Sequence, residues 1–189
     1  MSIVRTASVL LAALVTAFPV SGQTAEQWAN AAGAIRRLAP AAFSQLPATV
    51  RQALERRGCT VPQSFTDPGP HNVVRGHFAR PRQTDWAVLC SRQDTSVVLV
   101  FWAGRAAGAE ALNPQPDAAF LQEIGGGAIG FSRVLGVASA SRIRRYAKDH
   151  GGLPPTRMDH DGLEDAFAEK ASTIAYRDAG RWLDLAGAD

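Results

Sequence analysis

The sequence is poor in cysteine: only Cys59 and Cys90 occur among its 189 residues. They lie too far apart for the C-x-x-C spacing of redox and zinc-binding thiols, and no matched set of histidines completes a metal site with them. An isolated pair is typical of a structural disulfide formed in an oxidising compartment. The sequence therefore predicts a Cys59–Cys90 bridge and implies no metal or other cofactor.

A run of apolar residues long enough to span a bilayer, about 20 residues, is also lacking. The apolar run of residues 7–20 is shorter, and it is followed by small residues, Val20 and Gly22, at positions −3 and −1 of a cut before Gln23. This is the layout of a secretory signal peptide. We expect residues 1–22 to be removed and the mature protein to be periplasmic or secreted, without a membrane span.

Neither sign of charge dominates the chain, which has 20 basic and 17 acidic residues and a formal net charge of +3. So mild an excess does not favour binding to nucleic acid or to a membrane surface. The arginine doublets, such as Arg144-Arg145, are interpreted as solvated helix faces or helix C-termini, where cations are favoured.

The first part of residues 23–189 has apolar residues at the spacing of helices. Residues 23–189 have the length of one domain. A capping box at Thr24 opens a helix that ends before Pro40, and a second helix occupies residues 47–57. The second helix ends just before Cys59, which places this cysteine where it can reach a strand.

The middle of the chain changes to short runs rich in Val, Leu, Phe and Trp, which predict strands. These runs are residues 72–79, 84–91, 95–102 and 128–137, with a hairpin turn at 92–94. Trp86, Val88 and Cys90 share one face of the second run, and we expect that face to point toward the helices. Residues 97–102 are apolar on both faces, as in a central strand.

The later segments complete the expected fold. We expect a loop over 103–117, short helices at 118–124 and 162–168, a helix over 139–150, and a closing hairpin of 172–177 with 181–185. Together these elements predict an α+β fold, in which an antiparallel sheet carries the N-terminal helices on one face and the Cys59–Cys90 disulfide joins the two.

Acidic residues cluster around His160, and this cluster is the best candidate for chemistry. Asp159 and Asp161 are of the type that binds a hard cation, and His160, Asp161 and Asp165 could exchange protons in a hydrolase. The structural alternative makes Asp161 the N-cap of a helix with Glu164 at its third position. We favour the helix cap, because neither EF-hand nor zinc spacing is present.

Other motifs are weaker. Gly125, Gly127 and Gly130 match G-x-G-x-x-G but lack the strand before and the helix after that a dinucleotide site needs, so we interpret them as a turn. No G-x-S-x-G nucleophile elbow occurs. The four tryptophans are expected in the core or at sheet edges.

Two passages, residues 75–91 and 160–189, resemble a group of exported bacterial proteins of uncharacterised function. The first contains Arg75-Gly76-His77-Phe78 and Asp85-Trp86-Ala87-Val88, and it is similar to a single FG-GAP-type repeat, G-x-F followed by D-x-A-V. Residues 79–83 stand where that repeat has an acidic loop, and they are basic, so calcium binding is not carried over. The resemblance implies export and a compact domain.

The absence of a catalytic constellation favours a non-catalytic binding or interaction module of the cell envelope, whose partner is a wall component or another envelope protein. Two alternatives remain open. One is a small hydrolase, with or without a metal ion, that uses residues 159–165. The other is an inhibitor of a wall-degrading enzyme that acts through a protruding loop at 104–117.

Overall fold

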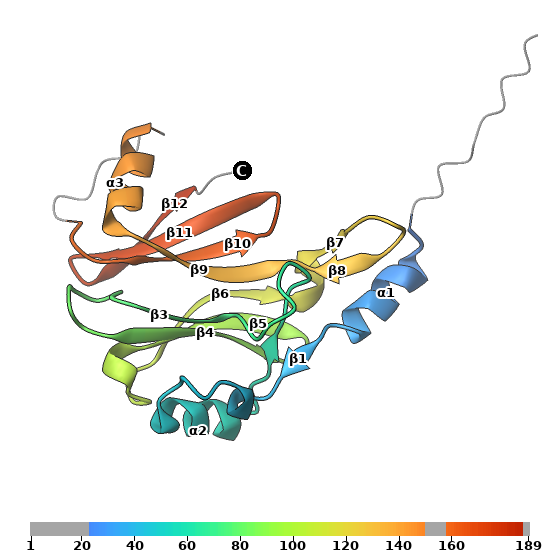
Figure 1. Ribbon diagram of the computed structural model, residues 1–189, viewed down its shortest axis with the longest axis horizontal. Helices are drawn as coiled ribbons and strands as arrows, with labels where there is room; N and C mark the ends of the chain where they lie inside the picture. Colours follow the sequence, from blue (N-terminus) through green and yellow to red (C-terminus); the bar gives the residue numbers. More distant parts are fainter. Residues whose placement is uncertain (1–22, 150–157, 187–189) are drawn as a thin grey trace, which may run out of the picture.

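The computed structural model describes residues 23–149 and 158–186, and the predicted signal peptide lies outside them. Two four-stranded antiparallel sheets lie one above the other (Figure 1). The first has the order β3 (Val73–Gly76), β4 (Asp85–Arg92), β5 (Thr95–Phe101), β6 (Glu110–Pro116). The second has the order β12 (Arg181–Ala186), β11 (Ala171–Asp178), β10 (Gly162–Phe167), β9 (Arg133–Ala138).

Short elements complete the chain. Two small antiparallel pairs are β1 (Arg37–Leu38) with β2 (Val61–Pro62), and β7 (Leu121–Glu123) with β8 (Ile129–Phe131). The 3-10 turns are η1 (Pro40–Ala42), η2 (Trp102–Gly104) and η3 (Asp117–Phe120). Among the described residues no helix is long and apolar enough to cross a membrane.

The main core fills the space between the two sheets. Leu89 and Val100 of the first sheet pack with Leu135 and Leu163 of the second, and all four are at most 5% exposed. Strand β4 is buried along nearly its whole length, since its alternate side chains enter two different cores. Apolar residues on both faces of β4 and β5 thus reflect their central position in the first sheet.

Helices α2 and α3 cover the outer faces of the two sheets (Figure 1). Helix α2 (Ala48–Arg56) buries Val50 and Leu54 against the face of the first sheet that carries Trp86 and Cys90. Helix α3 (Ala140–Asp149) lies against the second sheet, and α1 (Ala25–Gly33) lies beside β7 and β8. The α+β class, the antiparallel pairing and the Thr24 capping box are confirmed.

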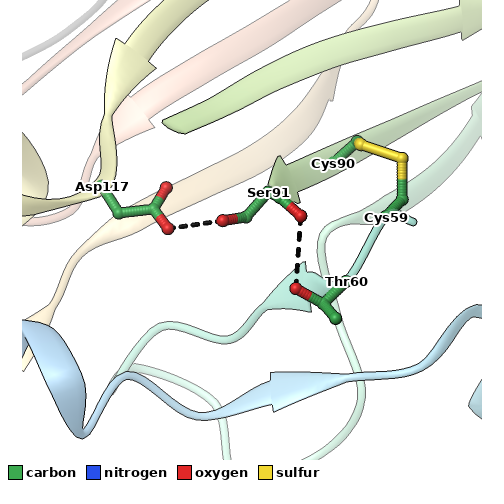
Figure 2. Close-up of a disulfide and its surroundings, with 5 residues drawn as sticks. All are labelled: Cys59, Thr60, Cys90, Ser91 and Asp117. Carbon is green, nitrogen blue, oxygen red and sulfur yellow. Dashed lines mark hydrogen bonds between the residues drawn. A yellow bond between two sulfur atoms is a disulfide. The ribbon is translucent and has the colours of Figure 1, made fainter. Parts of the chain in front are cut away.

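The Cys59–Cys90 disulfide is confirmed, with an S–S distance of 1.97 Å (Figure 2). It joins the segment that follows α2 to the central strand β4. Beside it, the backbones of Thr60 and Ser91 exchange two hydrogen bonds of 3.0 and 2.8 Å. The Ser91 hydroxyl donates to the buried Asp117 carboxylate at 2.5 Å, and Arg37 donates to the same oxygen at 2.8 Å. The bridge is therefore set in a polar network that reaches η3.

Asn72 makes a second buried polar connection and is 1% exposed. Its side-chain amide donates to the carbonyls of Pro62 (2.7 Å) and Arg133 (3.0 Å), and its Oδ1 accepts from the Leu135 N–H (2.9 Å). These bonds tie β2 to β9 through one side chain. Each side-chain polar atom is paired, as buried polar groups require.

Several expected elements are wrong. Residues 110–116, expected as loop, form the edge strand β6, and residues 118–124 form the end of η3 and the strand β7 instead of a helix. Residues 128–137 divide into β8 and β9 around Ser132. Residues 110–116 are a strand because they pair with β5, despite Pro114 and Pro116. A register shift between Ser96 and Val98 of β5 accommodates their irregular backbone.

Removal of the disulfide is expected to destabilise the protein strongly. The bridge closes a loop of 31 residues, which corresponds to about 3.5–4 kcal/mol in the chain-entropy model. The double variant C59S/C90S should therefore lose stability by about this amount in urea unfolding, with wild-type protein unfolded under a reductant as the control. An unchanged urea midpoint would contradict a stabilising role.

The second sheet contains a buried phenol that makes stability depend on pH. Burial raises the pKa of Tyr176 above its ordinary value, and the nearby Asp178 and Asp184 carboxylates add to the rise. The unfolded chain ionises this phenol near pH 10, whereas the folded protein keeps it neutral. The contribution of the neutral Tyr176 to the free energy of unfolding is therefore fully present below about pH 10. It is lost as the pH rises toward the folded-state pKa.

We expect the variant Y176F to lose less stability than wild type between about pH 9 and pH 11. Urea unfolding at both pH values measures the difference. Equal slopes in wild type and Y176F would show that burial of Tyr176 does not control its ionisation.

Candidate functional site

The acidic segment after His160 forms a strand. The expected helix over 162–168 and the N-cap role of Asp161 are therefore wrong. Residues 162–167 pair on both sides, with β9 and with β11. Gly162 lies beneath α3, where an added Cβ would approach the side chain of Ile143 to 2.8 Å. The acids of this segment thus alternate between the two faces of a sheet instead of gathering on the first turn of a helix.

Asp161 connects the ends of the two sheets. Its Oδ2 accepts from the backbone N–H of His77 at 2.9 Å and lies 3.3 Å from the Nδ1 of the same residue. Its own N–H donates to the His77 carbonyl at 3.0 Å. Since β3 ends at Gly76 and β10 begins at Gly162, these bonds hold the two strand ends together.

His160 is also held by structural contacts. Its side chain is 9% exposed, its Nε2 lies 3.0 Å from the Arg177 carbonyl, and its Nδ1 lies 3.1 Å from Oδ1 of Asp159. Both partners are acceptors only, so both contacts are hydrogen bonds when each ring nitrogen carries a proton. The imidazole therefore links the entry of β10 to strand β11.

Asp165 points between the sheets and forms a buried ion pair with Arg133, which is 0% exposed. Nε and Nη2 of Arg133 donate to the two carboxylate oxygens at 2.9 and 2.7 Å. Nη1 donates to the carbonyl and the hydroxyl of Ser96, and Nη2 also donates to the Asn113 carbonyl. All five guanidinium N–H groups are thus paired, and the group also lies 4.6 Å from the Phe120 ring centre.

The neighbouring acid, Glu164, points to the other face. Both of its oxygens accept from Arg142 of α3 at 2.5 Å, and Ser172 donates to Oε1. Hydrogen bonding to Glu164 is the main cause that raises the pKa of Arg142. Glu164 therefore fastens α3 to the second sheet.

The structure does not bring the predicted catalytic residues together. His160, Asp161 and Asp165 contact different partners, and no contact joins any two of them in the described part of the chain. The predicted metal ligands Asp159 and Asp161 contact different histidines. Within residues 23–149 and 158–186 there is no group of three or more His, Cys, Asp or Glu placed to hold a metal ion.

Gly125 and Gly127 lie in the turn that connects β7 to β8, as predicted, and both have positive φ angles. Gly130, the third glycine of the motif, was also expected in this turn but lies within β8, where it pairs with Gln122. A strand, not a helix, follows the turn, so the arrangement lacks the helix N-terminus on which a dinucleotide pyrophosphate would lie.

A hollow of about 370 Å³ opens between the sheets beside the Arg133–Asp165 pair. Its lining consists of Asn113, Gln115, Phe120, Asp165, Phe167, Ala171, Ser172, Thr173 and Asp184. We call it the inter-sheet hollow. The side chains of Gln115, Thr173 and Asp184 have no hydrogen-bond or ion-pair partner among the described residues. Three unpaired polar side chains from three strands therefore border one cavity.

The apolar part of the inter-sheet hollow is held in place by ring contacts. Phe120 and Phe167 lie with ring centres 5.7 Å apart, and Lys170 lies 4.5 Å from the Phe167 ring centre. With Arg133 over Phe120, each ring has a cation on one face. The hollow thus has both apolar and polar walls.

A pair of tryptophans also joins the two sheets. Trp102 and Trp182 stack with ring centres 5.8 Å apart, and Glu110 accepts from both indole N–H groups at 3.1 and 2.7 Å. Arg177 lies 4.6 Å from the Trp102 ring centre. Because Glu110 and Trp182 belong to the edge strands β6 and β12, this cluster fixes the separation of the two edges that border the inter-sheet hollow.

Comparison of the chain with protein-family models, curated proteins and solved structures finds no match. The resemblance to exported bacterial proteins and to an FG-GAP-type segment therefore stays a prediction. The functional assignment depends on geometry.

The sequence pattern missed Arg133 and the inter-sheet hollow. Gln115, Thr173 and Asp184 belong to separate strands and form no motif. The one available signal was Arg133 within an apolar run expected to be a strand, since a charge at a buried strand position requires a partner.

The buried ion pair predicts a characteristic mutational pattern. D165A leaves the buried guanidinium without its carboxylate and should destabilise the protein by about 3–5 kcal/mol in urea unfolding. R133M/D165L removes both charges and should lose less than the sum of the two single variants. D184A, an exposed acid on the same sheet, is the control and should stay within about 0.5 kcal/mol of wild type. Wild-type stability of D165A would exclude a structural role for the pair.

Proposed function

We propose that the protein is a non-catalytic binding module of the bacterial cell envelope and that its ligand enters the inter-sheet hollow. The observation that supports this proposal is the convergence of Gln115, Thr173 and Asp184 on one cavity without partners among the described residues. Small-molecule sites combine apolar walls with a few polar groups that fix orientation. The volume of about 370 Å³ lies at the lower end of the range for such sites, roughly 300–1,000 Å³.

The unpaired groups suit a ligand rich in hydroxyl groups. The Gln115 amide donates and accepts, the Thr173 hydroxyl does both, and the Asp184 carboxylate accepts. Arg133 neutralises Asp165, so Asp184 supplies the unpaired charge of the lining. A saccharide unit of a wall polymer offers hydroxyl donors for these groups and apolar C–H faces for the phenyl rings.

Binding explains the site better than hydrolysis does. A glycoside hydrolase needs two carboxyl groups that flank the bond to be cleaved. Here both oxygens of Asp165 accept hydrogen bonds from Arg133, so this carboxylate is engaged within the protein. The inhibitor hypothesis loses support as well, since residues 110–116 form a paired edge strand instead of a protruding loop.

Export is part of the proposal. The Cys59–Cys90 bridge supports an oxidising compartment, and the composition of residues 1–22 supports secretion. We therefore propose a periplasmic or secreted location, where a wall saccharide is accessible.

Titration with N-acetylglucosamine oligomers tests the proposed site. We expect saturable NMR shifts of the Gln115 and Thr173 amides. Q115A and D184A should each weaken binding by about five- to tenfold, the effect of one lost hydrogen bond. E123A removes an exposed acid on β7, outside the hollow, and should bind as wild type does.

Two results would contradict the proposal. One is the absence of saturable shifts around the inter-sheet hollow with both the oligomers and purified peptidoglycan fragments. The other is an equal loss of affinity in E123A and D184A, because it would show that overall charge, and not the hollow, determines binding.

A further inference from the structure

A second hollow, of about 620 Å³, lies at the end of the first sheet and is strongly basic. Its lining consists of Arg80, Pro81, Arg82, Gln83, Thr84, Ala103 and Arg105. These residues come from the connection between β3 and β4 and from the segment at η2. The lining, which we call the arginine hollow, has three guanidinium groups and no acidic side chain.

The guanidinium groups are largely unused within the protein. The side chains of Arg82 and Arg105 have no hydrogen-bond or ion-pair partner in the described part of the chain. Arg80 donates its Nε to Oε1 of Gln83 at 3.0 Å, and its two terminal nitrogens have no partner there. Like charges around one hollow repel each other. An anion in the arginine hollow would remove this repulsion and use the free donors.

A buried carboxylate fixes both walls of the arginine hollow. Asp85 is 0% exposed. Its Oδ2 accepts from the Ala79 N–H at 3.0 Å, and its Oδ1 accepts from the Gln83 amide and the Ala103 N–H, both at 2.8 Å. Because Gln83 in turn holds Arg80, the position of one guanidinium is set from the core. The two chain segments that carry the arginines are therefore held at a fixed separation.

The backbone is strained on both walls. Arg82 has a φ of 64° and Ala103 a φ of 49°, a left-handed conformation that non-glycine residues seldom adopt. Such strain persists where the surrounding structure imposes it and is frequent at ligand sites. Here the bond from Ala103 to Asp85 imposes it on one wall.

We propose that the arginine hollow binds a phosphate group, either as inorganic phosphate or as a phosphate monoester. Arginine presents a planar fork of donors that matches two oxygens of an oxyanion. Three such forks suit a tetrahedral dianion, which has more acceptor oxygens and more charge than a carboxylate. The arginine hollow shares no lining residue with the inter-sheet hollow, so this site is independent of the saccharide proposal.

Titration of the mature protein with inorganic phosphate, at an ionic strength held constant with sodium chloride, tests the proposal. We expect saturable NMR shifts of the amides of Arg82, Gln83 and Ala103, with a dissociation constant on the order of millimolar for an exposed site. R82A and R105A should each weaken binding by about fivefold or more. Alanine at position 82 keeps the same backbone preference, so R82A should fold as wild type does.

R181A is the matched control. Arg181 is an exposed arginine of β12, outside the arginine hollow, and its removal changes the net charge equally. R181A should bind phosphate as tightly as wild type. Linear shifts without saturation, or an equal loss in R181A and R82A, would overturn the proposal, because either would show diffuse attraction.

A second arm distinguishes the two sources of the phosphate group. Phosphatidylcholine vesicles with phosphatidic acid carry a phosphate monoester, and pure phosphatidylcholine vesicles are the control. Co-sedimentation that requires phosphatidic acid and is lost in R82A and R105A would support the proposal with a lipid headgroup as the source. Saturable phosphate binding without co-sedimentation would support it with soluble phosphate.

Discussion

The buried Arg133–Asp165 pair is the interaction on which the arrangement of the two sheets depends. A guanidinium taken out of water costs several kcal/mol unless its donors are paired, and here Ser96, Asn113 and Asp165 pair all of them. Those partners lie on β5, β6 and β10, so the requirement to satisfy one cation fixes strands of both sheets. Two of these partners, Asn113 and Asp165, also line the inter-sheet hollow, so the requirement to neutralise Arg133 helps to set its shape.

Polar groups also determine how the layers are joined elsewhere. Asn72 ties β2 to β9, and Asp161 ties the end of β3 to the start of β10. At the edge strands β6 and β12, the Glu110 carboxylate accepts hydrogen bonds from the indole N–H groups of both Trp102 and Trp182. Apolar packing supplies most of the driving force for such a core, whereas directional bonds select one relative position of the two sheets. A binding cavity between two sheets requires this fixed position.

Local patterns predicted the parts of the fold that local interactions decide. The Thr24 capping box, the α2 helix, the hairpin of β11 and β12, and the Cys59–Cys90 pair all follow from residues near in sequence or from simple counting. The strand conformation of residues 162–167 was not predicted from local patterns, because the acids of this segment suit a helix start. Only pairing with β9 and β11 makes the segment a strand. For the same reason Asp165 was singled out for chemistry, while its partner, 32 positions away, was not.

The edge strand β6 has Pro114 and Pro116 on its exposed backbone. Proline has no N–H group, so at both positions the free side of the strand cannot donate to a strand of another molecule. A two-sheet protein with open edges is prone to self-association through added strands. The two prolines that made residues 110–116 look like a loop in the sequence therefore also hinder the addition of a strand from another molecule at this edge.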